Sequence, residues 1–339
     1  MNLFLKTTAA ALAFATVATV TTAQDVTLRV HHFMSAKANL HSKFLVPFAE
    51  NVAIASDGRI NIEIFDSMAR GGGPAGLYDR AMEGADEIIL TLPGYTSGRF
   101  NRSEVFELPF MMDNAVATSK AVWDLVESEL QDDEFQDVKI LAAWVHGPGV
   151  IHSSEPIASL DDMKGVELRG PTRLVTDMLG EFGASPVGMP LPKIPENLSK
   201  GVITGATLPW EVTPSIKLGE LVQNHTEFGG DRALYTAVFI LAMNWDAYDA
   251  MPDDLKAILD AETGKGLSEF AGQVMIDADA SGRAVSENNN IISLSAEDVQ
   301  PWVEAAQPVY DRFVERAGDK GFDGQAAIDQ AKALIEANK

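Results

Sequence analysis

The sequence predicts an α/β protein of two lobes, with parallel or mixed sheets, a cleft between the lobes and long C-terminal helices. The chain has 339 residues, of which 46% are hydrophobic, and this length is more than one small core needs. A strand–helix–strand pattern occurs twice, as in sheets that are covered by helices. No Ser/Gly linker separates the two occurrences, so we expect the chain to cross between the lobes more than once.

The first occurrence of the pattern starts near the N-terminus. Apolar and polar residues alternate over 26–30 and again over 60–64, at the period of a half-buried strand. Apolar residues recur at helical spacing over 40–52, and a further helix is expected over 77–84. Residues 87–92 form a short apolar run that is typical of a buried strand.

The second occurrence follows an acidic segment, 127–137, which we interpret as a solvated face. It is expected to contain a helix over 174–181 and strands over 140–145, 166–169, 186–189 and 234–243. From residue 245 onward the pattern is almost wholly helical.

Charge and composition exclude several classes of protein. The 49 acidic and 26 basic side chains give a formal net charge of −23, which repels nucleic-acid phosphates and anionic lipid headgroups. We therefore expect no nucleic acid among the partners. The chain contains no cysteine, and this excludes disulfides, cysteine nucleophiles and iron–sulfur clusters.

Residues 1–23 have the features of a secretory signal peptide. Lys6 precedes an apolar run over 8–20, and the small residues Thr21, Thr22 and Ala23 follow it. The run is shorter than the roughly 20 residues that span a bilayer. We predict cleavage after Ala23 and a mature protein outside the cytoplasm.

No motif predicts a catalytic residue, a metal site or a cofactor. The adjacent His31 and His32 would point to opposite faces of a strand, so one metal ion could not bind both. The motifs HExxH and GxSxG do not occur. The glycine-rich segment 70–76 lacks the Lys-Ser/Thr pair of a P-loop, and we interpret it as a tight turn.

Large aromatic residues stand at the ends of three predicted strands, at Tyr95, Trp144 and Trp210. Residues at strand ends line the crevice of an open α/β sheet, so these three are candidate walls of the cleft. Packing inside the core is the alternative interpretation for each of them.

Several motifs occur in a specific order along the chain. They read FELPF at 106–110, KGVELR at 164–169, LGEFGASPVGMP at 179–190 and GVITGA at 201–206. Together they resemble the extracytoplasmic solute receptors of TRAP transporters, the DctP-type family, over nearly the whole mature chain. In the last motif Thr204 replaces the Asp of the family pattern.

The resemblance implies a periplasmic two-lobed binding protein that closes on a ligand and delivers it to a small and a large integral membrane subunit. It also implies that Arg169 binds the ligand carboxylate, because a guanidinium presents a planar pair of donors to two oxygens. We expect a monomer with lobe I at residues 24–146 plus 235–274, and lobe II at 147–234 plus 275–339.

Departures from the family pattern indicate a dry, aromatic pocket. Leu191 and Leu208 stand where many relatives carry an aromatic and a polar contact, and no second arginine lies near the loop 147–149. We expect a small organic monocarboxylate, with a betaine-like ligand favoured slightly over an aromatic acid, because Glu211 would attract a cation held over indole rings. The candidate ligand-binding residues are Arg169, Trp210, Trp144, Tyr95, Phe33, His146, Glu211 and Leu208.

Two other functions stay open. A ligand-sensing protein that reports to a signalling receptor would share the fold and the arginine. A secreted hydrolase or isomerase would use His146 or His152 with Glu211 or Asp161. Nothing in the linear sequence brings such an acid–base pair together.

Overall fold

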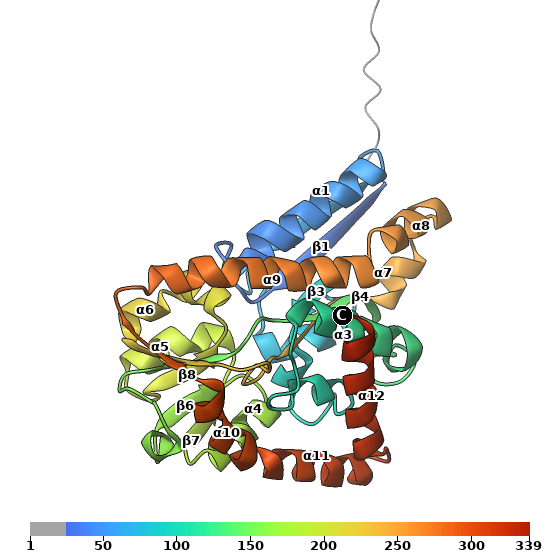
Figure 1. The fold of residues 1–339 in the computed structure, drawn as a ribbon. Helices are drawn as coiled ribbons and strands as arrows, with labels where there is room; N and C mark the ends of the chain where they lie inside the picture. Colours follow the sequence, from blue (N-terminus) through green and yellow to red (C-terminus); the bar gives the residue numbers. More distant parts are fainter. Residues whose placement is uncertain (1–24) are drawn as a thin grey trace, which may run out of the picture.

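The computed structural model describes residues 25–339, and the predicted signal peptide lies outside the described residues. The described chain forms two β-sheets flanked by helices (Figure 1). Strands pair in parallel and antiparallel fashion in both sheets, which confirms the predicted α/β class with mixed sheets. No helix within residues 25–339 combines the length and the apolar character that a membrane span needs.

The first sheet has the strand order β2-β1-β3-β10-β4. Its strands are β1 (Val26–His32), β2 (Ile60–Phe65), β3 (Ile88–Thr91), β4 (Lys139–Val145) and β10 (Val238–Met243). The helices that pack on it are α1 (Val46–Ala55), α2 (Leu77–Met82) and α3 (Ala115–Leu125). β1 runs parallel to β2 and β3, whereas β10 is antiparallel to both of its neighbours. Every residue of β10 is buried, so this late strand lies at the centre of the first core.

The second sheet has the order β11-β9-β5-β8-β6-β7. Its strands are β5 (Val150–Ser153), β6 (Glu167–Gly170), β7 (Ser185–Gly188), β8 (Gly205–Leu208), β9 (Asn224–Phe228) and β11 (Asn290–Leu294). The helices of this part are α4 (Arg173–Glu181), α5 (Ile194–Ser199) and α6 (Leu218–Leu221). Sequence analysis did not predict β5, β9 or β11. β9 begins with four polar residues, so it carries no alternation of apolar and polar side chains.

Three segments connect the two sheets. The chain leaves the first sheet over residues 146–149 and returns over 229–237. The short helices α7 (Trp245–Asp249) and α8 (Asp253–Ala261) then lead to the long helix α9 (Lys265–Val285), drawn in orange across the molecule in Figure 1. α9 packs on α3 and β4 and also on the 3₁₀ segment η8 (Trp210–Ile216), which follows β8.

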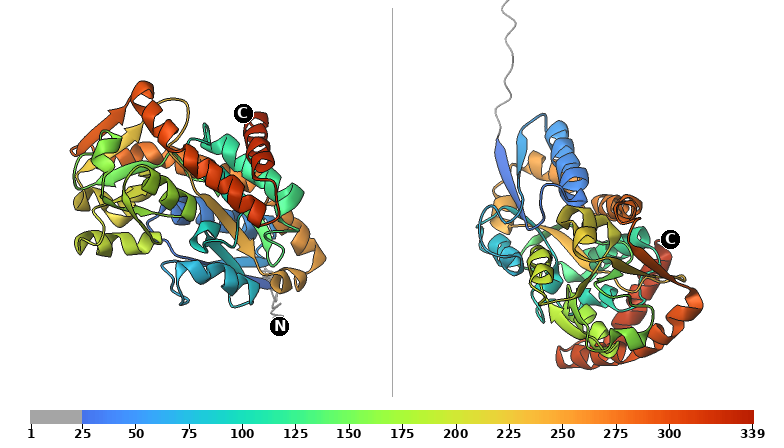
Figure 2. Two further views of the ribbon diagram at one scale, coloured as in Figure 1. Left: turned by 90° about the horizontal axis from the view of Figure 1, so that it is seen from below. Right: turned by 90° about the vertical axis from the view of Figure 1, so that its left-hand side faces the viewer.

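The C-terminal helices lie on the outside of the molecule (Figure 2). They are α10 (Ala296–Ala305), α11 (Gln307–Asp319) and α12 (Gly324–Ala337). α11 packs on α4, whereas α12 packs on α3, so these helices contact elements next to both sheets. The long C-terminal helices agree with the sequence analysis, and the division of the chain into lobes I and II stays a prediction.

The packing of α9 on η8 leads to a first testable prediction. A methyl group at Gly282 would overlap the main-chain carbonyl oxygen of Trp210, whereas a methyl group at Gly266, on the same helix, would meet no atom of another element within 4 Å. We expect Gly282→Ala to lower the free energy of unfolding by about 1–3 kcal/mol or more. Gly266→Ala is the matched control and should leave stability unchanged or slightly raised. Urea unfolding measures both, and equal stability of the two variants would contradict this packing.

Candidate functional site

A small cavity of about 40 Å³ lies where residues from both sheets meet. It is lined by residues at or after the ends of β1, β3, β4, β6 and β8, and by the start of β10. Its walls are Phe33, Met34, Leu92, Tyr95, His146, Arg169, Pro171, Leu191, Leu208, Pro209, Glu211, Val212, Tyr235, Ala237 and Phe239. A larger hollow of about 620 Å³ lies between the segment 229–232 and the C-terminal helices, but its charged residues are exposed. Of these two hollows, the small cavity is the one that is lined by buried charged or titratable side chains.

Among the lining residues of this cavity, Arg169 alone carries a guanidinium or ammonium group, and it is 1% exposed. It lies on β6, which pairs with β7 and β8 on either side, and this fixes its main chain. Its Nε donates to Met189 O at 2.9 Å, and its Nη1 donates to Thr207 O at 3.0 Å. Burial lowers the pKa of Arg169, yet a guanidinium stays protonated. No carboxylate forms an ion pair with it within residues 25–339, so the cavity contains a buried positive charge without an acidic partner.

Two phenols stand close to Arg169. The hydroxyl oxygen of Tyr95 accepts a hydrogen bond from Leu191 N at 3.1 Å. Burial raises the pKa of Tyr95 and of Tyr235, and the charge of Arg169 opposes this only in part. Both phenols are therefore neutral near pH 7, and each has a proton that it can donate to an anion beside Arg169.

His146 lies at the end of β4 and is also uncharged. Burial lowers its pKa to about 4. Its Nδ1 lies 2.5 Å from Gly147 O, and because a carbonyl only accepts, Nδ1 carries the proton. The ring packs edge-on against Tyr235 with 5.2 Å between centroids. His146 therefore contributes a neutral aromatic face to the cavity wall.

Glu211 is buried in the first turn of η8 and is 4% exposed. Its main-chain N–H donates to Asp279 Oδ1 at 2.9 Å, and its Oε2 accepts from Asn39 Nδ2 at 3.2 Å. Burial raises the pKa of Glu211 to about 8, and the attraction of Lys43 does not offset this. Glu211 is therefore mostly protonated at pH 7, which is contrary to the role in attracting a cation that we expected from the sequence.

The remaining wall is apolar. Phe33 packs edge-on against Tyr95 with 5.3 Å between centroids, and Leu208 lies at the end of β8. Six of the eight residues that the sequence suggested thus line one cavity: Phe33, Tyr95, His146, Arg169, Leu208 and Glu211. Their roles in ligand binding stay predictions.

The two tryptophans are not among the lining residues. Trp144 is fully buried and stacks on Phe239, with 5.7 Å between ring centroids and 12° between ring planes. Phe239 rather than Trp144 lines the cavity. Trp210 packs against His152, and its indole N–H donates to Glu227 Oε1 at 2.8 Å. Trp144 belongs to the hydrophobic core, whereas Trp210 is buried beside His152 and His225. A role of either tryptophan in ligand binding stays a prediction.

Tyr235 and Phe239 are wall residues that sequence analysis missed. We expected a strand over 234–243, but β10 starts at Val238, and Tyr235 lies in the buried loop before it. Because β10 is antiparallel to β3 and β4, its beginning lies beside their ends. The apolar run predicts a strand but not the direction of that strand. No sequence feature therefore indicated that its first residues lie at the cavity.

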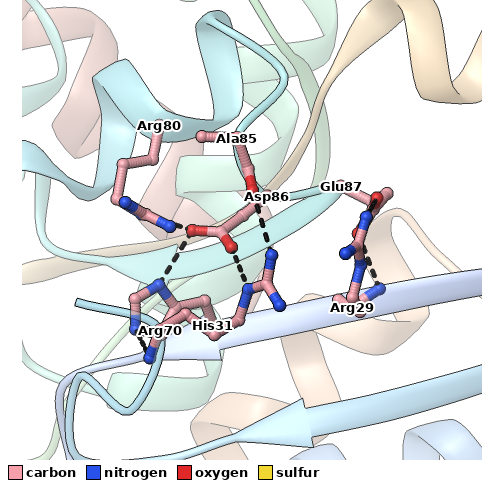
Figure 3. Close-up of polar contacts among 7 residues, drawn as sticks. All are labelled: Arg29, His31, Arg70, Arg80, Ala85, Asp86 and Glu87. Carbon is pink, nitrogen blue, oxygen red and sulfur yellow. Dashed lines mark hydrogen bonds and ion pairs between the residues drawn. The ribbon is translucent and has the colours of Figure 1, made fainter.

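A second polar cluster lies away from the cavity, between β1 and β3 (Figure 3). His31 Nδ1 is 2.8 Å from Asp86 Oδ2, and Arg70 and Arg80 also bind this buried carboxylate. No group of three potential metal ligands occurs within residues 25–339. This cluster ties the glycine-rich loop after β2 to the sheet, and none of its residues belongs to the cavity wall.

Two α/β lobes that enclose a buried arginine among aromatic walls define the class of solute receptors that bind a small anion. The model of the bacterial extracellular solute-binding proteins, family 7 (DctP), matches residues 30–317. The chain belongs to this family, and the resemblance to TRAP solute receptors that the motifs indicated is confirmed.

Solved structures and a characterised relative agree with this family. A TRAP solute-binding protein from Rhodoferax ferrireducens T118 in complex with copurified benzoate is 47% identical, with a TM-score of 0.90 over 92% of this chain and 98% of that chain. A marine metagenome TRAP solute-binding protein specific for aromatic acid ligands, in complex with 3-hydroxybenzoate, is 39% identical, with a TM-score of 0.91 over 94% and 100% of the two chains. The ectoine-binding periplasmic protein TeaA of Halomonas elongata is 26% identical over 77% of both chains.

The burial of Glu211 leads to a prediction about pH. Its pKa of about 8 lies above the ordinary value of 4.5, so the folded protein keeps a proton that the unfolded chain releases. The stability that Glu211 contributes is therefore complete below pH 4.5 and is lost as the pH rises through about 8. We expect Glu211→Gln, which cannot ionise, to weaken the fall of Tm between about pH 6 and 8.5.

The control for this experiment is Glu220→Gln, a change at an exposed glutamate of α6. Thermal unfolding without ligand, followed by circular dichroism, compares the slopes. Buried histidines contribute equally to all three proteins and cancel in the comparison. Equal slopes for Glu211→Gln and the unmodified protein would show that Glu211 is already ionised when folded.

Proposed function

We propose that this protein is the receptor of a TRAP transporter for an aromatic monocarboxylate, and that Arg169 binds the carboxylate. One observation carries the proposal: a fully buried arginine without an acidic partner stands in a cavity whose other walls are mostly aromatic and aliphatic. A carboxylate supplies the charge partner, and a ring fits the apolar remainder.

The solved relatives support the aromatic class. Two of them, at 47% and 39% identity, bind benzoate and 3-hydroxybenzoate. The sequence slightly favoured a betaine-like ligand, and two observations now speak against it. Trp144 and Trp210 do not line the cavity, and Glu211 is mostly uncharged. Because one relative is an ectoine-binding protein, a betaine-like zwitterion is the second candidate ligand.

We further propose the path and the partners of this receptor. Cleavage after Ala23 releases it into the periplasm as a monomer, where lobe I and lobe II close on the ligand. It delivers the ligand to a small and a large integral membrane subunit and performs no catalysis. Within residues 25–339, no hydrogen bond joins His146 or His152 to Glu211 or Asp161, so the acid–base pairs of the enzyme alternative are not formed. A sensing role would use the same cavity.

Replacing the arginine tests the carboxylate site. We expect Arg169→Gln to abolish measurable binding of benzoate, because removal of one member of a buried charge pair costs about 3–5 kcal/mol, or several hundredfold in Kd. Arg312→Gln is the control, since Arg312 is partly exposed and pairs with Glu181 on the surface. Calorimetry measures affinity, and circular dichroism checks the fold. Affinity of Arg169→Gln within a few fold of the unmodified protein would disprove this assignment.

A panel of ligands tests the chemical class. We expect benzoate to bind and glycine betaine to give no heat, since a quaternary ammonium group would be buried without an ionised partner. A dicarboxylate of similar length should also fail, because the lining residues include no second arginine or lysine and His146 is uncharged. Isothermal titration of the three compounds decides the class, and tight binding of glycine betaine alone would favour the second candidate.

A further inference from the structure

The polar groups of the cavity differ in how far the protein itself satisfies them. Arg169 donates to two main-chain carbonyls, and His146 donates to the carbonyl of the next residue. Glu211 has a partner for only one of its carboxyl oxygens, because Oε2 accepts from Asn39 while Oε1 has no hydrogen bond within residues 25–339. Oε1 keeps some accessible surface, and Glu211 lines the cavity, so this oxygen is free to form a hydrogen bond with a group that enters.

Three hydrogen bonds with two neighbouring residues fix the position of Glu211. Its main-chain N–H donates to Asp279 of α9, at 2.9 Å, and its main-chain carbonyl accepts from Asn39 Nδ2, also at 2.9 Å. The same Asn39 amide group contacts Oε2 of the side chain. Such support from neighbouring elements holds the carboxyl group in one orientation, as precise recognition requires.

Glu211 and Arg169 are able to act on one ligand at two different points. Both line the same cavity, and no ion pair joins them, so their charged or polar ends are not in contact. Apolar side chains such as Leu208 and Val212 make up the nearby wall. A ligand whose carboxylate binds Arg169 therefore meets few polar groups besides Glu211 along the rest of its surface.

We propose that Glu211 determines specificity: its Oε1 forms a hydrogen bond with a hydroxyl group of the ligand, so that the receptor prefers hydroxylated aromatic monocarboxylates to the unsubstituted acid. This inference rests on the proposed function, because it takes the ligand carboxylate to bind Arg169. A site that bonds a hydroxyl group rejects the analogue without it, since the buried partner is then left unpaired. Burial raises the pKa of Glu211 to about 8, and the protonated carboxyl group can donate to the hydroxyl oxygen as well as accept from it.

The test compares the Kd of benzoate with the Kd values of 2-, 3- and 4-hydroxybenzoate by calorimetry. We expect at least one isomer to bind the unmodified protein about tenfold or more tightly than benzoate does. Glu211→Leu should remove this preference and bring the ratio of the two Kd values close to one. Glu211→Gln, which keeps a hydrogen-bonding group and the contact with Asn39, should retain part of it.

The ratio of Kd values separates specificity from a structural effect. Loosening of η8 would weaken all four acids alike and leave the ratio unchanged. Glu107→Gln is the matched control, because Glu107 is another buried carboxyl group, bonded to Val238 N and outside the cavity wall, and this variant should keep the ratio.

The outcomes distinguish this inference from the proposed function. If benzoate and the hydroxybenzoates bind the unmodified protein equally well, or if Glu211→Leu keeps the preference, the role of Glu211 is wrong while the aromatic-acid function stands. If none of these acids binds, the proposed function fails and the specificity assignment fails with it.

Discussion

The charge of Arg169 is the constraint on which the cavity depends. A charge removed from water costs several kcal/mol unless a partner compensates it, and no carboxylate pairs with this guanidinium within residues 25–339. The carbonyls of Met189 and Thr207 bind two of its N–H groups, so the side chain is held rigidly but keeps its net charge. In the folded protein this cation is already buried and oriented. An anion can therefore bind to it with little reorganisation of the protein.

The connections between the sheets hold the cavity walls in place around this charge. Gly149 N donates to Tyr235 O at 3.0 Å, and a side chain at Gly149 would overlap the Tyr235 ring. Thr236 Oγ1 donates to His146 O at 2.7 Å, so the two crossing segments are bonded to each other beside the cavity. Asp279 of α9 binds the main chain of Glu211 from the other side. The two crossing segments therefore also supply wall residues of the cavity, His146 and Tyr235.

The sequence predicted the features that depend on local patterns or on motifs. Alternation identified the early strands, and the motif around Arg169 identified the buried cation. The environment of an aromatic residue was not predictable in this way: Trp144 and Tyr95 both stand near strand ends, but Trp144 packs behind Phe239 and only Tyr95 reaches the cavity. Tyr235 was missed because its position depends on the antiparallel direction of β10, a tertiary property that no short stretch of sequence encodes.

The charge state of the cavity follows from burial rather than from composition. The protein as a whole carries a net charge of −23, and the sequence led us to expect that Glu211 attracts a cation. Inside the cavity, burial keeps Glu211 mostly protonated, the phenols of Tyr95 and Tyr235 neutral and His146 unprotonated, so Arg169 alone sets the charge at about pH 7. One positive charge among neutral groups matches a single carboxylate. A second negative charge on the ligand would lack a partner in the cavity wall, so the electrostatics of the cavity favours a ligand with one carboxylate.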